Sequence, residues 1–196
     1  NFNEFTMLEF YRLGFDIHQL MDDVGALIKT LGAKGDVVKL SYAQAFQQFA
    51  GIDILNTDFI DLKAIAKSHD LSSDFDWIED LQIFLFTALC ESKLAQFPIC
   101  FIYDYPAQQS ALARVEGQVA HRFELYLSGV EVANGYDELQ DAQSYNEVFN
   151  RENSKRQQLN KPFFEPDATF LKQLESSLPQ CSGVAIGIDR LISQIN

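Results

Sequence analysis

Hydrophobic residues recur every three or four positions through most of the first half of the chain, the spacing of helices with one buried face. Asp16 and Gln19 have the spacing of a capping box, and Gly32 is a typical residue just after a helix end. The apolar face of the helix between them comprises Ile17, Leu20, Met21, Val24, Leu27, Ile28 and Leu31. The pattern predicts that residues 16–96 are mainly helical.

Three further helices are expected within this block. Ser41 begins a second capping box, for a short helix that stops near Gly51. Another helix is expected over 58–68, and a longer one over 74–94 with Asp74 as its N-cap. Packing alone explains the apolar periodicity of these helices, so the block offers no candidate site.

Alternating apolar and polar residues predict strands at the start of the chain and in its second half. The expected strands are 4–12, 99–105, 122–127, 130–136 and a glycine-containing strand from Ser182, and the helices of the second half are 142–158 and 167–178. Strands that follow one another without a helix between them favour an antiparallel sheet with flanking helices, an α+β fold. We expect one domain over 1–196, with 16–96 as a helical insertion and 98–196 as the sheet hairpin, helices and glycine strand.

Composition excludes several classes of protein. The formal net charge is −13, so the chain as a whole lacks the basic surface typical of nucleic-acid binding, although a local basic groove stays compatible with it. No apolar run approaches the ~20 residues of a membrane span. The 3 cysteines are widely spaced and the 3 histidines are isolated, which indicates neither a disulfide framework nor a zinc site. A cytoplasmic protein that does not bind membranes is expected.

The strand from Ser182 to Gly187, followed by Arg190, is a candidate nucleotide site. Glycines on one face of a strand allow a flat ligand to lie against the backbone. An arginine at the end of the strand offers a charged fork to phosphate. Glycines in an apolar strand more often mark close packing, however, and the pair Asp189-Arg190 is equally compatible with a surface position.

The expected hairpin around Ser128-Gly129 carries a second group of polar residues. Glu124 and Glu131 lie on opposite arms, and two close carboxylates favour protonation of one or a cation between them, for which Mg²⁺ with ligand phosphates is suitable. Solvated acids on an edge hairpin are the alternative.

On the second arm Asn134, Tyr136 and Glu138 would share one face of a regular strand. A carboxylate beside an aromatic ring suits a buried alkylammonium. An ordinary polar strand is the alternative.

Taken together, these segments resemble class II aminoacyl-tRNA synthetases of the lysyl type. Residues 182–190 resemble motif 3, and 122–141 resemble the amino-acid-binding hairpin of the lysyl enzymes. Residues 4–11 resemble the strand that ends motif 2, and 106–113 the segment that precedes the hairpin. The resemblance implies an incomplete class II catalytic core that lacks motif 1 and most of motif 2, including its arginine.

Within that family the chain is most similar to the GenX/PoxA branch, whose members attach β-lysine to a lysine of translation elongation factor P. Ala185 stands where lysyl-tRNA synthetases have glycine, and the segment 107–113 lacks their Ser-Pro. The chain also has no basic appendage at its end. One methyl group in a tight site discriminates between substrates by ~1–3 kcal/mol, so Ala185 would affect where an α- or β-amino group lies.

The resemblance assigns one set of residues to ATP and magnesium. Arg190 would be catalytic through its contact with the ATP phosphates, and Gly187, Val132 and Glu131 would also contact ATP. Glu131 and Glu124 together would hold Mg²⁺ on the phosphates. Asn1 or Asn3 is offered for a further nucleotide contact.

A second set is assigned to the amino acid. Tyr11 and Glu138 would recognise the side-chain ammonium of lysine or β-lysine, Asn134 and Tyr136 would complete the pocket, and Ala185 would form its floor. The parent protein is expected to be an ATP-dependent ligase and a homodimer, with residues 1–196 inactive alone. Two alternatives are a lysyl-tRNA synthetase core that acts on tRNA and a noncatalytic synthetase-like module that binds a partner or regulates.

Overall fold

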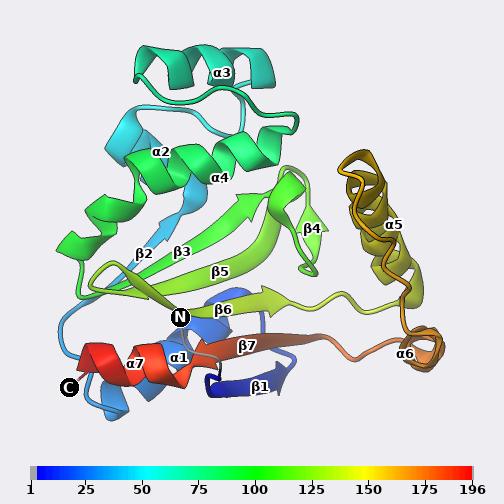
Figure 1. Cartoon of the computed structure of the whole chain (residues 1–196). Helices are drawn as coiled ribbons and strands as arrows, with labels where there is room; N and C mark the ends of the chain where they lie inside the picture. The colour runs from blue at the N-terminus through cyan, green and yellow to red at the C-terminus, as the bar shows by residue number, and fades with distance from the viewer. Residues whose placement is uncertain (1–3, 196) are drawn as a thin grey trace.

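The computed structural model describes residues 4–195, which leaves the expected nucleotide contact at Asn1 or Asn3 outside the described residues. A seven-stranded sheet forms the centre, in the order β1-β7-β6-β5-β3-β2, with β4 paired to β5 (Figure 1). The strands are β1 (Met7–Leu13), β2 (Val37–Ser41), β3 (Ile99–Pro106), β4 (Val115–Glu116), β5 (Val119–Leu127), β6 (Val130–Asp137) and β7 (Cys181–Gly187). The α-helices are α1 (Ile17–Thr30), α2 (Tyr42–Ala50), α3 (Phe59–Ser68), α4 (Ile78–Leu89), α5 (Ala142–Gln158), α6 (Ala168–Gln173) and α7 (Ile188–Ile195), and the 3₁₀ turns are η1 (Glu91–Gln96), η2 (Ala107–Gln109) and η3 (Leu174–Ser176).

The α+β prediction is confirmed, with one correction inside the block expected to be mainly helical. Residues 37–41 form β2, which pairs with β3 in parallel, whereas every other strand pair named is antiparallel. Five residues are too few for periodicity to separate a strand from a helix, and the β-branched Val37 and Val38 favour the strand. The crossover that a parallel pair requires is supplied by α2, α3 and α4.

The predicted and observed helix starts agree at the two capping boxes, where a side chain caps the helix. Both capping boxes form, at Asp16 and at Ser41, and Gly51 ends α2 with φ 68°, a conformation that glycine adopts without strain. The expected start at Asp74 is wrong, because α4 begins at Ile78 after Trp77, with no side-chain cap. The helices expected over 74–94 and 167–178 are also shorter than predicted. The first ends with α4 and is followed by the 3₁₀ turn η1, and the second ends with α6 and is followed by η3.

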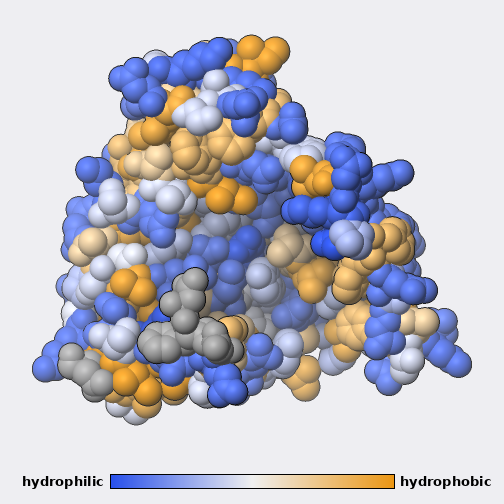
Figure 2. All heavy atoms as spheres, in the orientation of Figure 1, coloured by the Kyte–Doolittle hydropathy of each residue, from blue (hydrophilic) through white to orange (hydrophobic). Residues whose placement is uncertain are grey.

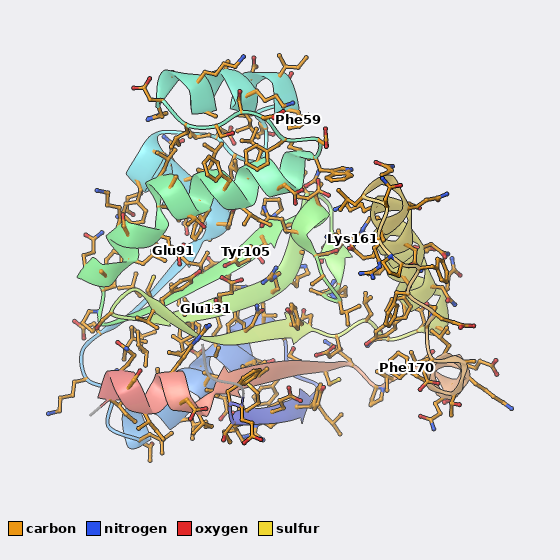
Figure 3. All side chains as sticks on the ribbon, in the orientation of Figure 1. Phe59, Glu91, Tyr105, Glu131, Lys161 and Phe170 are labelled. Atoms are coloured by element: carbon orange, nitrogen blue, oxygen red, sulfur yellow. The ribbon has the colours of Figure 1, made fainter. Side chains whose placement is uncertain are left out.

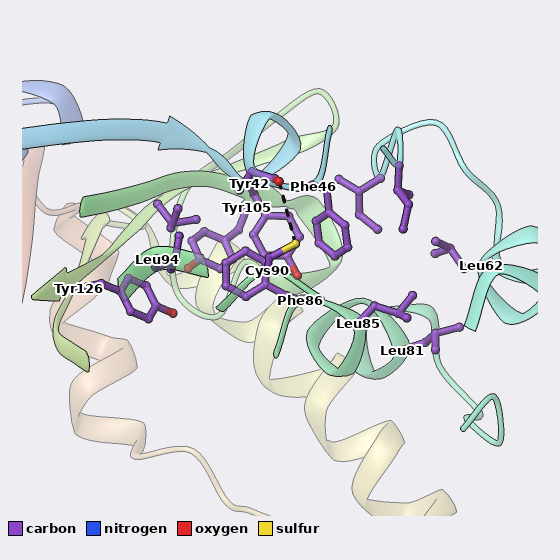
Figure 4. Packing of buried hydrophobic residues seen from close by; sticks show 14 of the residues in the cluster. Tyr42, Phe46, Leu62, Leu81, Leu85, Phe86, Cys90, Leu94, Tyr105 and Tyr126 are labelled. Carbon is purple, nitrogen blue, oxygen red and sulfur yellow. Dashed lines mark hydrogen bonds between the residues drawn. The ribbon is translucent and has the colours of Figure 1, made fainter. Parts of the chain in front are cut away.

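Two hydrophobic cores lie on opposite faces of the sheet. Helix α1 packs on one face, where Phe101, Phe123 and Ile186 are fully buried. Helix α2 packs on the other face, over β3 and β2, with α4 against α2 and α3 against α4. Figure 4 shows aromatic and aliphatic side chains of this second cluster. The alternation of side chains along β3 explains the division, because Phe101 faces α1 while Ile102 faces the α2–α4 cluster.

The three cysteines are buried and unpaired, as their spacing predicted. Burial raises the pKa of the Cys90 and Cys100 thiols to about 12. Among residues 4–195, no helix is both long and apolar enough to cross a membrane.

In the part of the chain that the structure describes, no helix covers the face of β1, β7 and β6 that is turned away from α1. In Figure 1 the α2–α4 cluster stands above this face, α7 lies below it, and α5 with α6 extends to one side. In Figure 2 the centre of the same view is hollowed, and hydrophilic residues gather there. The candidate site residues lie on this open face.

Candidate active site

Strand register aligns the predicted site residues in two rows across the open face. In one row Ala185 lies between Glu9 of β1 and Asn134 of β6, and Asn134 is opposite Glu124 of β5. In the next row Gly183 lies between Tyr11 and Tyr136, and Tyr136 is opposite Arg122. Residues paired across neighbouring strands share a face, so four strands contribute to one surface.

A bulge brings Glu131 to this surface. Leu125 pairs with Ala133 and Tyr126 with Glu131, so Val132 is an extra residue on β6. Without the extra residue, Glu131 and Asn134 would point to opposite faces of the strand. The bulge therefore places Glu131 on the same face as Glu124, and the charge of Glu124 adds to burial in raising the pKa of Glu131.

Glu124 is held by three donors. Arg122 donates from Nη2 to Oε1 at 2.6 Å, the Tyr126 hydroxyl donates to Oε2 at 2.7 Å, and Asn134 Nδ2 donates to Oε1 at 3.5 Å. A carboxylate offers about four lone-pair positions, so a cation ligand position is left on Glu124. Two nearby carboxylates, one with a raised pKa, fit a divalent ion that is also bound by phosphate oxygens. No group of three or more His, Cys, Asp or Glu side chains suited to a metal occurs among residues 4–195.

Arg190 lies at the end of β7, in the first turns of α7. Its Nη1 donates to the Glu131 carbonyl oxygen at 3.0 Å and lies 3.8 Å from Glu131 Oε2, while 63% of its side chain stays exposed. Figure 3 labels Glu131, on β6 near the start of α7. The charge of Arg190 opposes the rise in the Glu131 pKa.

A cavity of about 910 Å³ opens beside Arg190. Its lining includes Gly187, Ala185, Val132, Asn134 and Glu131. Four residues that the sequence assigned to ATP therefore line this cavity, namely Glu131, Val132, Gly187 and Arg190, together with Ala185 and Asn134, which were assigned to the amino acid.

The predicted ammonium residues converge at the other end of the open face. A β-carbon added at Gly183 would lie 2.5 Å from Tyr11 Cε1 and 2.7 Å from Glu138 Oε1, so the Tyr11 ring and the Glu138 carboxylate both lie directly over this glycine. Burial, with a smaller contribution from the charge of Asp137, raises the pKa of Glu138 to about 7. A half-buried carboxylate beside an exposed aromatic ring suits a cationic ligand group.

Three residues near the site escaped sequence reasoning. Gly183 could have been found by alternation from Ala185. Tyr145 of α5 is buried near Glu138, whose charge adds to burial in raising the pKa of Tyr145 to about 12, and helical periodicity does not reveal such a contact. Arg122 lies within the assigned hairpin segment, and its spacing of two residues from Glu124 on the same strand is the signal that could have found it.

The open face thus carries Arg190 at one end and the Glu138 carboxylate at the other, with Ala185 and Asn134 between them. Residues 1–196 match the family described as "tRNA synthetases class II (D, K and N)", and the chain belongs to that family.

Within this family, the chain is similar to several curated proteins that share one name. The chain is similar to proteins named "Elongation factor P--(R)-beta-lysine ligase" from Vibrio vulnificus (41% identical), Proteus mirabilis (42%) and Haemophilus ducreyi (38%). Each match covers 96% of this chain. The chain spans 60% of the length of the first two relatives and 59% of the third.

Proposed function

We propose that the protein carrying this chain is an ATP-dependent ligase that activates (R)-β-lysine or lysine as an adenylate and transfers it to a lysine of elongation factor P. The names of the similar proteins and membership of the class II family support the reaction. The observation that carries the proposal is the open face itself, which offers Arg190 at one end and the half-buried carboxylate of Glu138, beside Tyr11, at the other.

In the first step a carboxylate oxygen of the amino acid attacks the α-phosphorus of ATP, and pyrophosphate leaves. Arg190 would bind the phosphates, while the open surface at Gly187 and Val132 would receive the nucleoside. Mg²⁺ held by Glu124 and Glu131 would supply charge neutralisation on the phosphates. Glu138, Tyr11 and Tyr136 would fix the amino acid by its distal ammonium, so that its carboxylate meets the α-phosphate in line.

In the second step the ε-amine of the acceptor lysine attacks the adenylate carbonyl. An amide forms, AMP leaves with the bonding electrons, and the amine loses a proton to solvent. A homodimer in the cytoplasm is part of the proposal, and the unpaired state of Cys90, Cys100 and Cys181 supports a reducing compartment.

The acceptor is tested directly by offering two candidates. The protein is incubated with ATP, Mg²⁺ and (R)-β-lysine together with elongation factor P, and separately with lysine-accepting tRNA. Mass spectrometry is expected to show one β-lysyl group on elongation factor P. If only the tRNA is charged, the result would support the lysyl-tRNA synthetase alternative. If no product forms and ATP is not consumed in an amino-acid-dependent way, the result would support a noncatalytic module.

Ala185 is expected to set the preference between β-lysine and α-lysine. Its methyl group lies between the two ends of the open face, opposite Glu9 and Asn134, where the amino group next to the reacting carboxylate would lie. In Ala185→Gly the ratio of kcat/KM for α-lysine over (R)-β-lysine should rise about tenfold, as expected for one methyl group in a tight site. Pyrophosphate exchange with each amino acid measures the ratio, and an unchanged ratio would remove Ala185 from the specificity pocket.

A further inference from the structure

Arg122, a residue outside the assigned site, is held by hydrogen bonds from both of its terminal nitrogens. Its side chain is only 12% exposed. Nη2 donates to Glu124 Oε1 at 2.6 Å, and Nη1 donates to the backbone oxygen of Gln109 at 3.0 Å. The guanidinium also lies over the Tyr105 ring, 4.4 Å from its centroid, and 5.5 Å from the centroid of Tyr136. Two charge-assisted hydrogen bonds and two aromatic rings therefore fix it in one orientation.

Gln109, which accepts from Arg122, is itself anchored to the helical block. It is 7% exposed, and its Nε2 donates to Gln82 Oε1 of α4 at 3.0 Å and to the Tyr42 hydroxyl of α2 at 3.4 Å. The Tyr42 hydroxyl in turn donates to the Gln82 carbonyl at 3.1 Å. Figure 4 shows Tyr42 beside Tyr105 in the same cluster, with ring centroids 4.7 Å apart.

The contacts form a continuous chain from α2 and α4 to the site. Gln82 and Tyr42 hold the side chain of Gln109, the backbone of Gln109 holds one arm of Arg122, and the other arm of Arg122 holds Glu124. Buried hydrogen bonds that share members in this way restrict the side chains they join, although the Nε of Arg122 itself has no hydrogen-bond partner among residues 4–195. The position of the Glu124 carboxylate is thus linked to helices that carry no site residue of their own.

We propose that Arg122 is a positioning residue of the activation site, which fixes the Glu124 carboxylate for a divalent cation and is itself fixed, through Gln109, by α2 and α4. The inference rests on the proposed function in taking Glu124 and Glu131 as the cation ligands. Residues that orient metal ligands without touching the metal typically change metal affinity about 10- to 100-fold when replaced.

Lysine cannot replace Arg122 in this role. A single ammonium group cannot donate in a planar fork to the Gln109 carbonyl and to Glu124 while it also stacks between two rings. Arg122→Lys keeps the positive charge but removes the hydrogen bonds that orient the Glu124 carboxylate. The variant therefore distinguishes an orienting role of Arg122 from simple neutralisation of the Glu124 charge.

The test is a titration of Mn²⁺, followed by electron paramagnetic resonance, into the protein carrying this chain in the presence of ATP. Arg122→Lys is expected to raise the Kd for Mn²⁺ about tenfold, with an unchanged Tm. The matched control is Arg156→Lys on α5, whose Nε donates to the Pro162 carbonyl and touches no site residue; its Kd should equal that of the unaltered protein. An unchanged Kd in Arg122→Lys would overturn the inference.

A second variant covers the case in which Arg122→Lys lowers the Tm. Gln109→Met removes the link to Gln82 and keeps the Arg122 acceptor, because that acceptor is a backbone atom. It should raise the Mn²⁺ Kd severalfold, and the double variant should be no worse than Arg122→Lys alone, since Gln109 acts through Arg122. Additive effects would contradict this order of action. The Mn²⁺ titration is independent of amino-acid activation, so absent pyrophosphate exchange in the unaltered protein counts against the proposed function and not against the role of Arg122.

Discussion

Glu138→Gln should weaken lysine or β-lysine binding at least about thirtyfold while ATP binding changes less than about twofold, because removing one partner of a buried charge pair costs about 2–5 kcal/mol. The variant keeps the shape of the side chain and removes only its charge. The measurement is the KM for the amino acid and for ATP in pyrophosphate exchange. Glu116→Gln, an exposed carboxylate on β4, is the matched control and should change neither value.

The same residue predicts a pH dependence. The pKa of Glu138 is raised to about 7, so the protonated, neutral form dominates below this pH and the charged form above it. Only the charged form pairs with an ammonium, so the amino-acid KM should fall as the pH rises through about 7. In Glu138→Gln this dependence should disappear. Equal losses for ATP and amino acid, or a pH profile that survives the substitution, would count against the ammonium role.

Gly183→Ala should raise the amino-acid KM about thirtyfold, because overpacking of a tight site costs about 1–3 kcal/mol. The added methyl group would lie 2.5 Å from the Tyr11 ring and 2.7 Å from the Glu138 carboxylate, so both must shift. The backbone of Gly183 is not in the left-handed region, so the substitution acts through contacts and not through backbone strain. The measurement is again the KM for each substrate, with Tm recorded to confirm folding.

Gly187→Ala is the matched control on the same strand and face. The nearest protein atom to its added methyl group is the Val132 carbonyl oxygen at 3.7 Å, an ordinary contact, so the free protein should accommodate it. Because Gly187 lines the cavity beside Arg190, this variant should raise the KM for ATP and leave that for the amino acid. A rise in the ATP KM with Gly183→Ala, or in the amino-acid KM with Gly187→Ala, would show that the two ends of the open face are wrongly assigned.

Much of the fold was predictable because its signals are local. The capping boxes at Asp16 and Ser41 need only residues three positions apart, and both form. Strand β2 was missed because a run of five residues has no periodicity of its own and becomes a strand through pairing with β3. The start of α4 was predicted at the wrong residue, because a residue type that can cap a helix, such as Asp74, does not by itself start one.

The sequence predicted which residues belong to the candidate site better than it predicted how their side chains face one another. The motifs contained Glu124, Glu131 and Glu138, but whether Glu131 faces Glu124 depends on the extra residue Val132, and bulges leave no signal in a single sequence. The link from Arg122 to the helical block joins residues 13 to 67 positions apart, so only the folded chain reveals it.

The central claim is that one site on the open face activates an amino acid that it selects by a side-chain ammonium. The most direct measurement is pyrophosphate exchange by the protein carrying this chain, with (R)-β-lysine and lysine compared against norleucine, whose side chain lacks the ammonium. We predict that at least one of the two ammonium-bearing substrates exceeds norleucine by at least about thirtyfold in kcat/KM, as expected for a buried charge pair. Equal exchange with norleucine, or no exchange with either lysine, would contradict the account.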